Sequence, residues 1–130
     1  MKIFVDANVL FSAAYSQKGK AFDLISSGIH IVTSDYAINE AKKNLSLKWA
    51  NALEHLDKLI EKIEVVVSVE SEGCPINLPT KDRPIFLAAM KSNATHLLTG
   101  DLKDFGRFMN KPEKSAGNVI QTVNDFLKSL

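Results

Sequence analysis

Short runs of β-branched and other apolar residues alternate with helix-like segments along the chain, and this alternation limits the folds open to it. We expect strands over residues 2–5, 29–33, 65–69, 95–99 and 118–121. Strands that alternate with helices usually lie parallel, because parallel neighbours need a crossover connection that is commonly a helix. The sequence therefore predicts an α/β fold with a mainly parallel central sheet.

The segments between these runs have helical patterns. We expect helices over residues 9–14, 20–27, 36–47, 85–90 and 122–130, and a short helix within 100–108. A further amphipathic helix is predicted from the three-to-four-residue spacing of Trp49, Leu53, Leu56, Ile60 and Ile63. Residues 71–81 contain one glycine and two prolines, which indicates a loop.

Length and composition indicate what kind of protein this is. The 130 residues are 45% hydrophobic, which predicts one domain over residues 1–130. The formal net charge is only +1, so the protein as a whole does not carry the large positive charge that would attract polyanions. A single cysteine, Cys74, excludes an internal disulfide. Because no segment is typical of a signal peptide or a membrane span, we expect a cytoplasmic protein.

Acidic residues follow the expected strands at positions that favour a shared site. Asp6 follows the first strand and Asp101 follows the fourth, so parallel strands would carry both to the same edge of the sheet. Asp82 begins the helix over 85–90. Glu40 lies one turn inside the helix after the second strand, from which its side chain could lean toward the same edge.

Each acid also has a simpler interpretation. Asp6 and Asp82 could cap helices, Asp101 could belong to a turn, and Glu40 could lie on a solvated helix face. If they do converge, two carboxylates about 4 Å apart would repel by roughly 4 kcal/mol at an effective dielectric constant near 20. An all-oxygen group of this kind favours Mg²⁺ or Mn²⁺, which activate water toward a phosphodiester.

Four motifs in this order resemble those of the PIN-domain ribonuclease family, whose members include toxins of the VapC type. The segment at 3–10 is similar to its first motif, with Asp6 and Asn8 before an apolar helix. Residues 32–34 with Glu40 resemble the second motif. The segment at 82–89, an acid opening an alanine-rich helix, resembles the third, and residues 97–105 resemble the fourth.

The resemblance implies a three-layer α/β/α fold and a metal-dependent endoribonuclease, in many members the toxin of a toxin–antitoxin pair. Carried over by position, the metal-binding and catalytic acids would be Asp6, Glu40, Asp82 and Asp101. Asn8 and Thr99 would orient carboxylates or water, and Asp104 would be a further acid. Asn8 could instead cap a helix, and Thr99 could simply end a strand.

The resemblance also implies RNA as substrate, an antitoxin as partner and a homodimer. The main alternative is a degenerate PIN-like module that binds RNA or protein without cutting. A phosphoaspartate hydrolase would need a second aspartate where Asn8 stands, and no glycine-rich phosphate loop is present.

Overall fold

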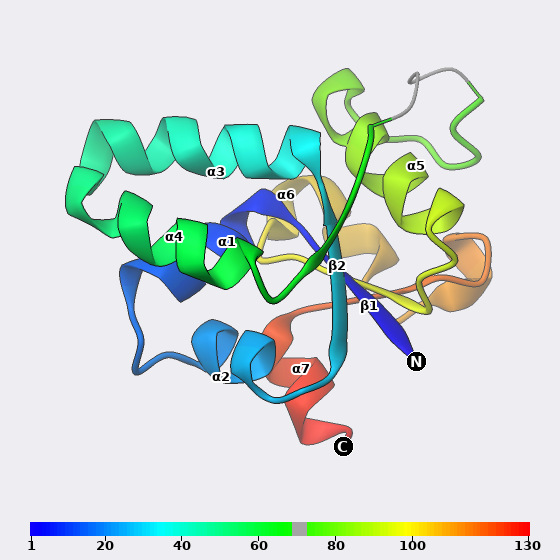
Figure 1. Ribbon diagram of the computed structural model, residues 1–130. Coiled ribbons are helices and arrows are strands. Elements are labelled where there is room, and N and C mark those ends of the chain that lie inside the picture. Colours follow the sequence, from blue (N-terminus) through cyan, green and yellow to red (C-terminus); the bar gives the residue numbers. More distant parts are fainter. Residues whose placement is uncertain (69–72) are drawn as a thin grey trace.

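The structure, a computed structural model, describes residues 1–68 and 73–130, and Figure 1 shows the course of the chain. Its strands form one five-stranded sheet in the order β3-β2-β1-β4-β5, in which every neighbouring pair is parallel. The strands are β1 (Lys2–Val5), β2 (His30–Ser34), β3 (Glu64–Val66), β4 (His96–Leu98) and β5 (Val119–Gln121). The predicted α/β fold with a parallel sheet is confirmed.

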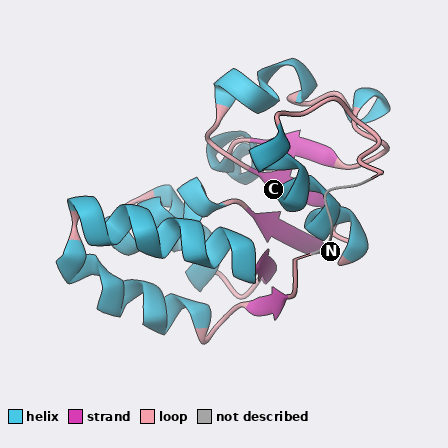
Figure 2. Cartoon of the chain, turned by 90° about the horizontal axis from the view of Figure 1, so that it is seen from above, coloured by secondary structure: helices cyan, strands magenta, loops and turns pink. Residues whose placement is uncertain are grey.

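Helices cover both faces of the sheet and complete three layers. They are α1 (Ala7–Tyr15), α2 (Lys20–Ser26), α3 (Asp35–Lys48), α4 (Leu53–Ile60), α5 (Arg83–Lys91), α6 (Leu102–Phe105) and α7 (Val123–Lys128). In Figures 1 and 2, helices α1, α3 and α4 pack together on one face of the sheet, and α5 lies on the other. Ile3, Phe4 and Val5 of β1 are fully buried because both sides of this central strand are covered.

The order of the strands reverses at the centre of the sheet. From β1 the chain moves outward through β2 to β3, then crosses back to β4 and continues to β5. The register pairs Phe4 with Leu97 and Val5 with Leu98, so Asp6 and Thr99 leave the sheet side by side. A reversal of this kind opens a crevice beyond the carboxyl ends of the strands, where ligands bind in such folds.

The predicted helix that starts at Trp49 was wrong in its first part. Trp49 ends α3 with φ −148° and ψ 63°, and a short 3₁₀ turn, Ala50–Ala52, separates it from α4. These dihedral angles let the chain reverse, so that α3 and α4 form a helical hairpin (Figure 1). Trp49 therefore lies at the hairpin's turn with 41% of its surface exposed, whereas Leu56 and Ile63 are buried as expected.

Most other predicted bounds lie within two residues of the observed ones, as is usual at element ends. The predicted amphipathic helix, however, runs to Ile63, three residues beyond the end of α4. β3 is shorter than the predicted strand over 65–69, of which Val69 lies outside the described residues, as do positions 71 and 72 of the predicted loop. Within the described ranges, no helix combines the length and apolar character needed to cross a membrane.

Candidate acidic site

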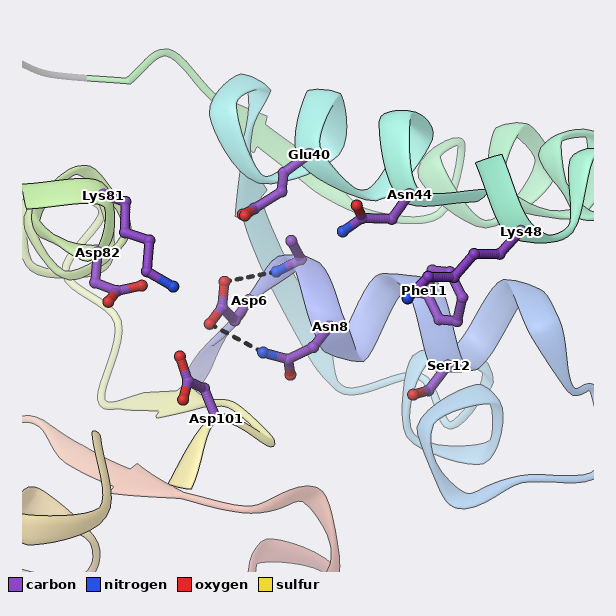
Figure 3. A pocket seen from close by; sticks show the side chains of 11 residues that line it. Asp6, Asn8, Phe11, Ser12, Glu40, Asn44, Lys48, Lys81, Asp82 and Asp101 are labelled. Carbon is purple, nitrogen blue, oxygen red and sulfur yellow. Dashed lines mark hydrogen bonds between the residues drawn. The ribbon is translucent and has the colours of Figure 1, made fainter. Parts of the chain in front are cut away.

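Asp6 is held at the end of β1 by three hydrogen bonds. Its Oδ1 accepts from the backbone N–H of Ala7 at 2.7 Å, so Asp6 caps α1. Its Oδ2 accepts from Thr99 Oγ1 at 2.8 Å and from Asn8 Nδ2 at 3.2 Å. With 4% of its surface exposed, this carboxyl group is buried and fixed in direction (Figure 3).

Asn8 and Thr99 tie the ends of β1 and β4 together. Asn8 Nδ2 also donates to Thr99 Oγ1 at 3.1 Å, and Asn8 Oδ1 accepts from the N–H of Gly100 at 2.7 Å. Thr99 Oγ1 accepts in turn from the N–H of Asp101 at 3.1 Å. Asp6, rather than Asn8, provides the cap of α1. These contacts suit Asn8 and Thr99 to positioning two of the acids.

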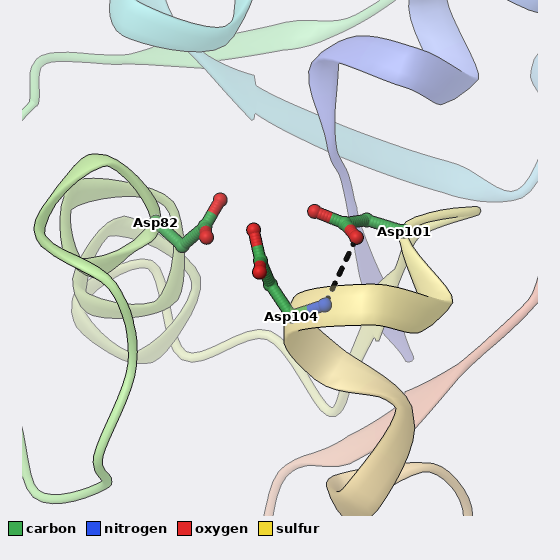
Figure 4. Close-up of side chains that lie close together, drawn as sticks. All are labelled: Asp82, Asp101 and Asp104. Carbon is green, nitrogen blue, oxygen red and sulfur yellow. Dashed lines mark hydrogen bonds between the residues drawn. The ribbon is translucent and has the colours of Figure 1, made fainter.

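A second part of the site comes from α6 and the turn before α5. Asp101 caps α6, because its Oδ1 accepts from the N–H of Asp104 at 3.0 Å. Asp82, at the end of the 3₁₀ turn Thr80–Asp82, faces them (Figure 4). One carboxylate oxygen from each of Asp82, Asp101 and Asp104 lies within 4.8 Å of the other two. Asp104, predicted only as a further acid, thus belongs to this compact group.

All four acids that the motifs single out line one cavity of about 260 Å³, shown in Figure 3. Asp6, Asp82 and Asp101 come from the sheet edge and the turn before α5, and Glu40 comes from the exposed face of α3. Asp6 and Glu40 are outside the compact group and lie on other walls of the cavity. The structure therefore brings the predicted acids together, with the tightest contacts among Asp82, Asp101 and Asp104.

Burial raises the pKa of two of these acids, Asp6 and Asp82. Loss of hydration raises the pKa of Asp6 to about 6, although the hydrogen bonds from Thr99 and Ala7 oppose the shift. Burial also raises the pKa of Asp82 to about 7, with a further contribution from Asp104. Both carboxyl groups would be more stable with a cation beside them than without one.

Asp104 and Lys81 complete the charge distribution. A hydrogen bond with Asp82, followed in importance by one from Lys81, holds the pKa of Asp104 below its ordinary value. Lys81 Nζ lies 3.1 Å from Asp104 Oδ2, and this contact raises the pKa of Lys81. Asp82 therefore holds its proton to a higher pH than Asp104 does, and Lys81 pairs with Asp104.

The donor set fits a hard divalent cation. Asp82 Oδ2 is buried and has no hydrogen-bond partner among the described residues, so this carboxylate lacks a partner that a buried oxygen needs. The compact group offers only carboxylate oxygens, which is the chemistry that Mg²⁺ and Mn²⁺ prefer. In the part of the chain that the structure describes, Lys81 is the one lysine paired with an aspartate of the compact group, so a bound cation would add positive charge that the group lacks.

Four further residues of the cavity were missed in the sequence: Phe11, Ser12, Asn44 and Lys48. The four-residue spacing along α1 and α3 could have identified Ser12, Asn44 and Lys48. Ser12 lies four residues after Asn8 on α1, and Asn44 and Lys48 lie four and eight residues after Glu40 on α3. Residues four apart share a helix face, so each motif residue marks the first position of a row along the cavity.

We expect Asp82→Asn to stabilise the metal-free protein at pH 8. Because its folded pKa of about 7 exceeds the ordinary 3.8, Asp82 makes the fold less stable as pH rises through this window. The asparagine amide does not ionise and so avoids this loss of stability. We place the resulting gain in the free energy of unfolding at about 1–2 kcal/mol, after discounting for solvent screening. Urea unfolding at pH 8 and pH 4 measures it.

The gain should disappear at pH 4, where the wild-type carboxyl group is protonated. Asp57→Asn, at an exposed position on α4, is the matched control and should change little at either pH. A variant no more stable than the wild type at pH 8 would show that the buried carboxylate is not destabilising.

No model of a known family matches the sequence, and neither does any curated protein. Solved structures do match. A protein from Pyrobaculum aerophilum superposes with a TM-score of 0.70 at 19% identity, over 99% of this chain and 88% of its own. VapBC2 from Rickettsia felis, bound to a DNA fragment from its promoter, gives a TM-score of 0.66 at 16% identity, over 94% of this chain and 98% of that one.

VapC20 from Mycobacterium tuberculosis, described as a toxin that cleaves the sarcin-ricin loop, gives a TM-score of 0.60 at 14% identity, over 78% of this chain and 91% of its own. At such identities the likeness concerns the fold. It agrees with the fold that the four sequence motifs imply, so the chain has the PIN-domain fold of the VapC-like proteins.

Proposed function

We propose that this chain is a divalent-metal-dependent endoribonuclease that hydrolyses phosphodiester bonds in RNA. The observation that carries the proposal is the convergence of acids from both halves of the chain in one cavity beyond the carboxyl ends of β1 and β4. Asp6 and Asp101 also cap helices, but capping does not require the acids to lie together, and carboxylates this close repel one another. RNA as the substrate rests on the resemblance of the motifs.

Asp82, Asp101 and Asp104 would hold the metal ion, with Asp6 and Glu40 facing it from other walls of the cavity. Bound Mg²⁺ or Mn²⁺ lowers the pKa of water and neutralises charge that develops on a phosphate. Asn8 and Thr99 fix the direction of the Asp6 carboxylate and the backbone of Asp101. With a pKa raised to about 6, Asp6 is also suited to accept a proton near neutral pH.

We make four further proposals, on domain organisation, location, oligomeric state and biological role. Residues 1–130 form one domain, since β1 lies between strands from both halves of the chain. The protein acts in the cytoplasm as a homodimer. It is the toxin of a toxin–antitoxin pair, as the VapC-type structures suggest. Growth arrest on expression, relieved by co-expression of a neighbouring gene, tests the last proposal; harmless expression of active enzyme would contradict it.

The test of the proposed function is a paired assay on the purified chain. We expect Mn²⁺ or Mg²⁺ to support cleavage of single-stranded RNA, EDTA to abolish it, and calorimetry to detect Mn²⁺ binding. Absence of both cleavage and Mn²⁺ binding would contradict the proposal and leave the fold as a binding module. RNA incubated with metal but without protein is the control.

A further inference from the structure

A second cavity lies beside the acidic one, along the helical hairpin. This second cavity, of about 520 Å³, lies at the far end of α1 and α3 and shares Lys48 with the first. Its lining residues are Tyr15, Lys48, Trp49, Ala50, Asn51, Ala52 and His55. The two cavities therefore meet at one basic side chain, about 12 Å along α3 from Glu40 at 1.5 Å per residue.

Three aromatic rings follow this path, and we call Phe11, Tyr15 and Trp49 the aromatic strip. Phe11 and Tyr15 are stacked, with ring centroids 6.2 Å apart and an interplanar angle of 18°. Tyr15 and Trp49 meet edge to face at 4.8 Å. Phe11 begins the strip within the acidic cavity (Figure 3).

The strip is open to solvent although its rings are large. Tyr15 is 52% exposed and Trp49 is 41% exposed. Lys48 Nζ lies 5.9 Å from the centre of the Phe11 ring, so a cation stands over the strip where the two cavities meet. Phe11 is partly buried against the core, whereas Tyr15 and Trp49 lie outside it and offer their edges and faces to a ligand.

The polar side chains along the path suit the phosphates of a nucleic-acid strand. Glu40 begins it among acids that suit a cation, Asn44 follows one turn later, and Lys48 lies one turn beyond that. A phosphate at the acids would be held through the cation, and a phosphate farther along the same strand would meet Lys48. Aromatic faces beside a basic side chain are the usual platform for unpaired bases.

A protein segment fits this surface less well. An apolar helix laid over the rings would bury the Lys48 amino group, and none of the described residues forms a salt bridge with it. Duplex RNA does not fit the rings, because its bases are already stacked on one another.

We propose that the aromatic strip and Lys48 bind the single-stranded RNA substrate, with Tyr15 and Trp49 stacking on bases a few nucleotides from the cleaved bond. This rests on the proposed nuclease function and assigns a substrate path to it. The strip positions the RNA and selects single strands. It takes no part in bond cleavage.

Trp49 is the only tryptophan of the chain, so its fluorescence reports directly on the strip. The binding experiment uses Asp82→Asn, to limit cleavage, with a 12-mer of uridine, a 12-mer of adenosine, their duplex and an abasic 12-mer. We expect both single strands to quench the emission and the duplex and the abasic chain to leave it nearly unchanged. Tyr15→Ala should weaken single-strand binding roughly tenfold, and Tyr15→Phe by less than about threefold.

The kinetic experiment uses the chain with its acids intact. Trp49→Ala should raise KM for single-stranded RNA roughly tenfold and leave kcat within about threefold, because the ring contributes equally to substrate and transition-state binding. Trp49→Phe should restore most of the loss. Leu47→Ala is the matched control, since Leu47 is 75% exposed on the same helix and lines neither cavity.

The outcomes separate this inference from the proposed function. Base-dependent quenching without any cleavage would support the strip and contradict the nuclease. Cleavage with an unchanged KM in Trp49→Ala, or with no quenching by any RNA, would overturn the strip and leave this face to a protein partner.

Discussion

Asp82→Asn and Asp101→Asn are each expected to lower kcat for RNA cleavage by on the order of a thousandfold. Each substitution removes one negative charge from the group that would hold the cation and leaves the side chain almost the same size. Asp82 Oδ2 has no hydrogen-bond partner in the described structure, so replacing this carboxylate breaks no hydrogen bond at that atom. Single-turnover cleavage of a labelled RNA with Mn²⁺ measures the effect.

Comparing kcat among variants of the individual acids ranks their contributions to cleavage. If the compact group holds the metal, Asp104→Asn should cost nearly as much as Asp101→Asn, and Glu40→Gln should cost clearly less. The reverse order would favour the acid set implied by the motifs. Asp57→Asn should cleave like the wild type, and Asp82→Asn must stay folded and be more stable at pH 8. An Asp82→Asn variant that retains cleavage within tenfold would contradict the assignment.

Mn²⁺ is expected to bind about a hundredfold more weakly at pH 5 than at pH 8. Metal ions bind ionised carboxylates, so a proton on a ligand must leave first. With a pKa of about 7, about one Asp82 side chain in a hundred is ionised at pH 5, whereas most are at pH 8. Asp6, with a pKa raised to about 6, adds to the loss if it also contacts the ion.

An exposed cluster of ordinary aspartates would behave differently, because carboxyl groups with a pKa near 3.8 are ionised at both pH values. Calorimetry at pH 6 in two buffers of different ionisation enthalpy would count the protons released, and we expect about one. Asp82→Asn should reduce both the proton release and the pH dependence. Equal affinity at pH 5 and pH 8 would show that the buried acids do not bind the ion.

Much of this site could be predicted from local sequence, because the parallel sheet carries strand ends to a common edge. Asp6 and Asp101 follow β1 and β4, which are direct neighbours in the sheet. Glu40 could be predicted only from the motif. Its side chain is exposed, as a solvated residue would be, and its place in the cavity depends on the packing of α3 beside α1.

The remaining features depend on tertiary geometry that local patterns do not encode. Asp104 joins the compact group because Asp101 caps α6 and turns that helix toward Asp82. The apolar spacing after residue 48 indicated one helix beginning at Trp49, since periodicity does not show where a chain reverses. The reversal at Trp49 brings an exposed ring beside Tyr15 and builds the second cavity.

The central position of β1 has a consequence for the protein during its synthesis. Ile3 pairs with His96, so β1 is without one neighbour until β4, more than 90 residues later, has left the ribosome. Asp82, Asp101 and Asp104 emerge after the entire first half, and the acidic group cannot assemble before β4 inserts beside β1. The proposed nuclease would therefore lack its acidic group as a nascent chain, and cleavage of RNA could begin only after β4 has inserted beside β1.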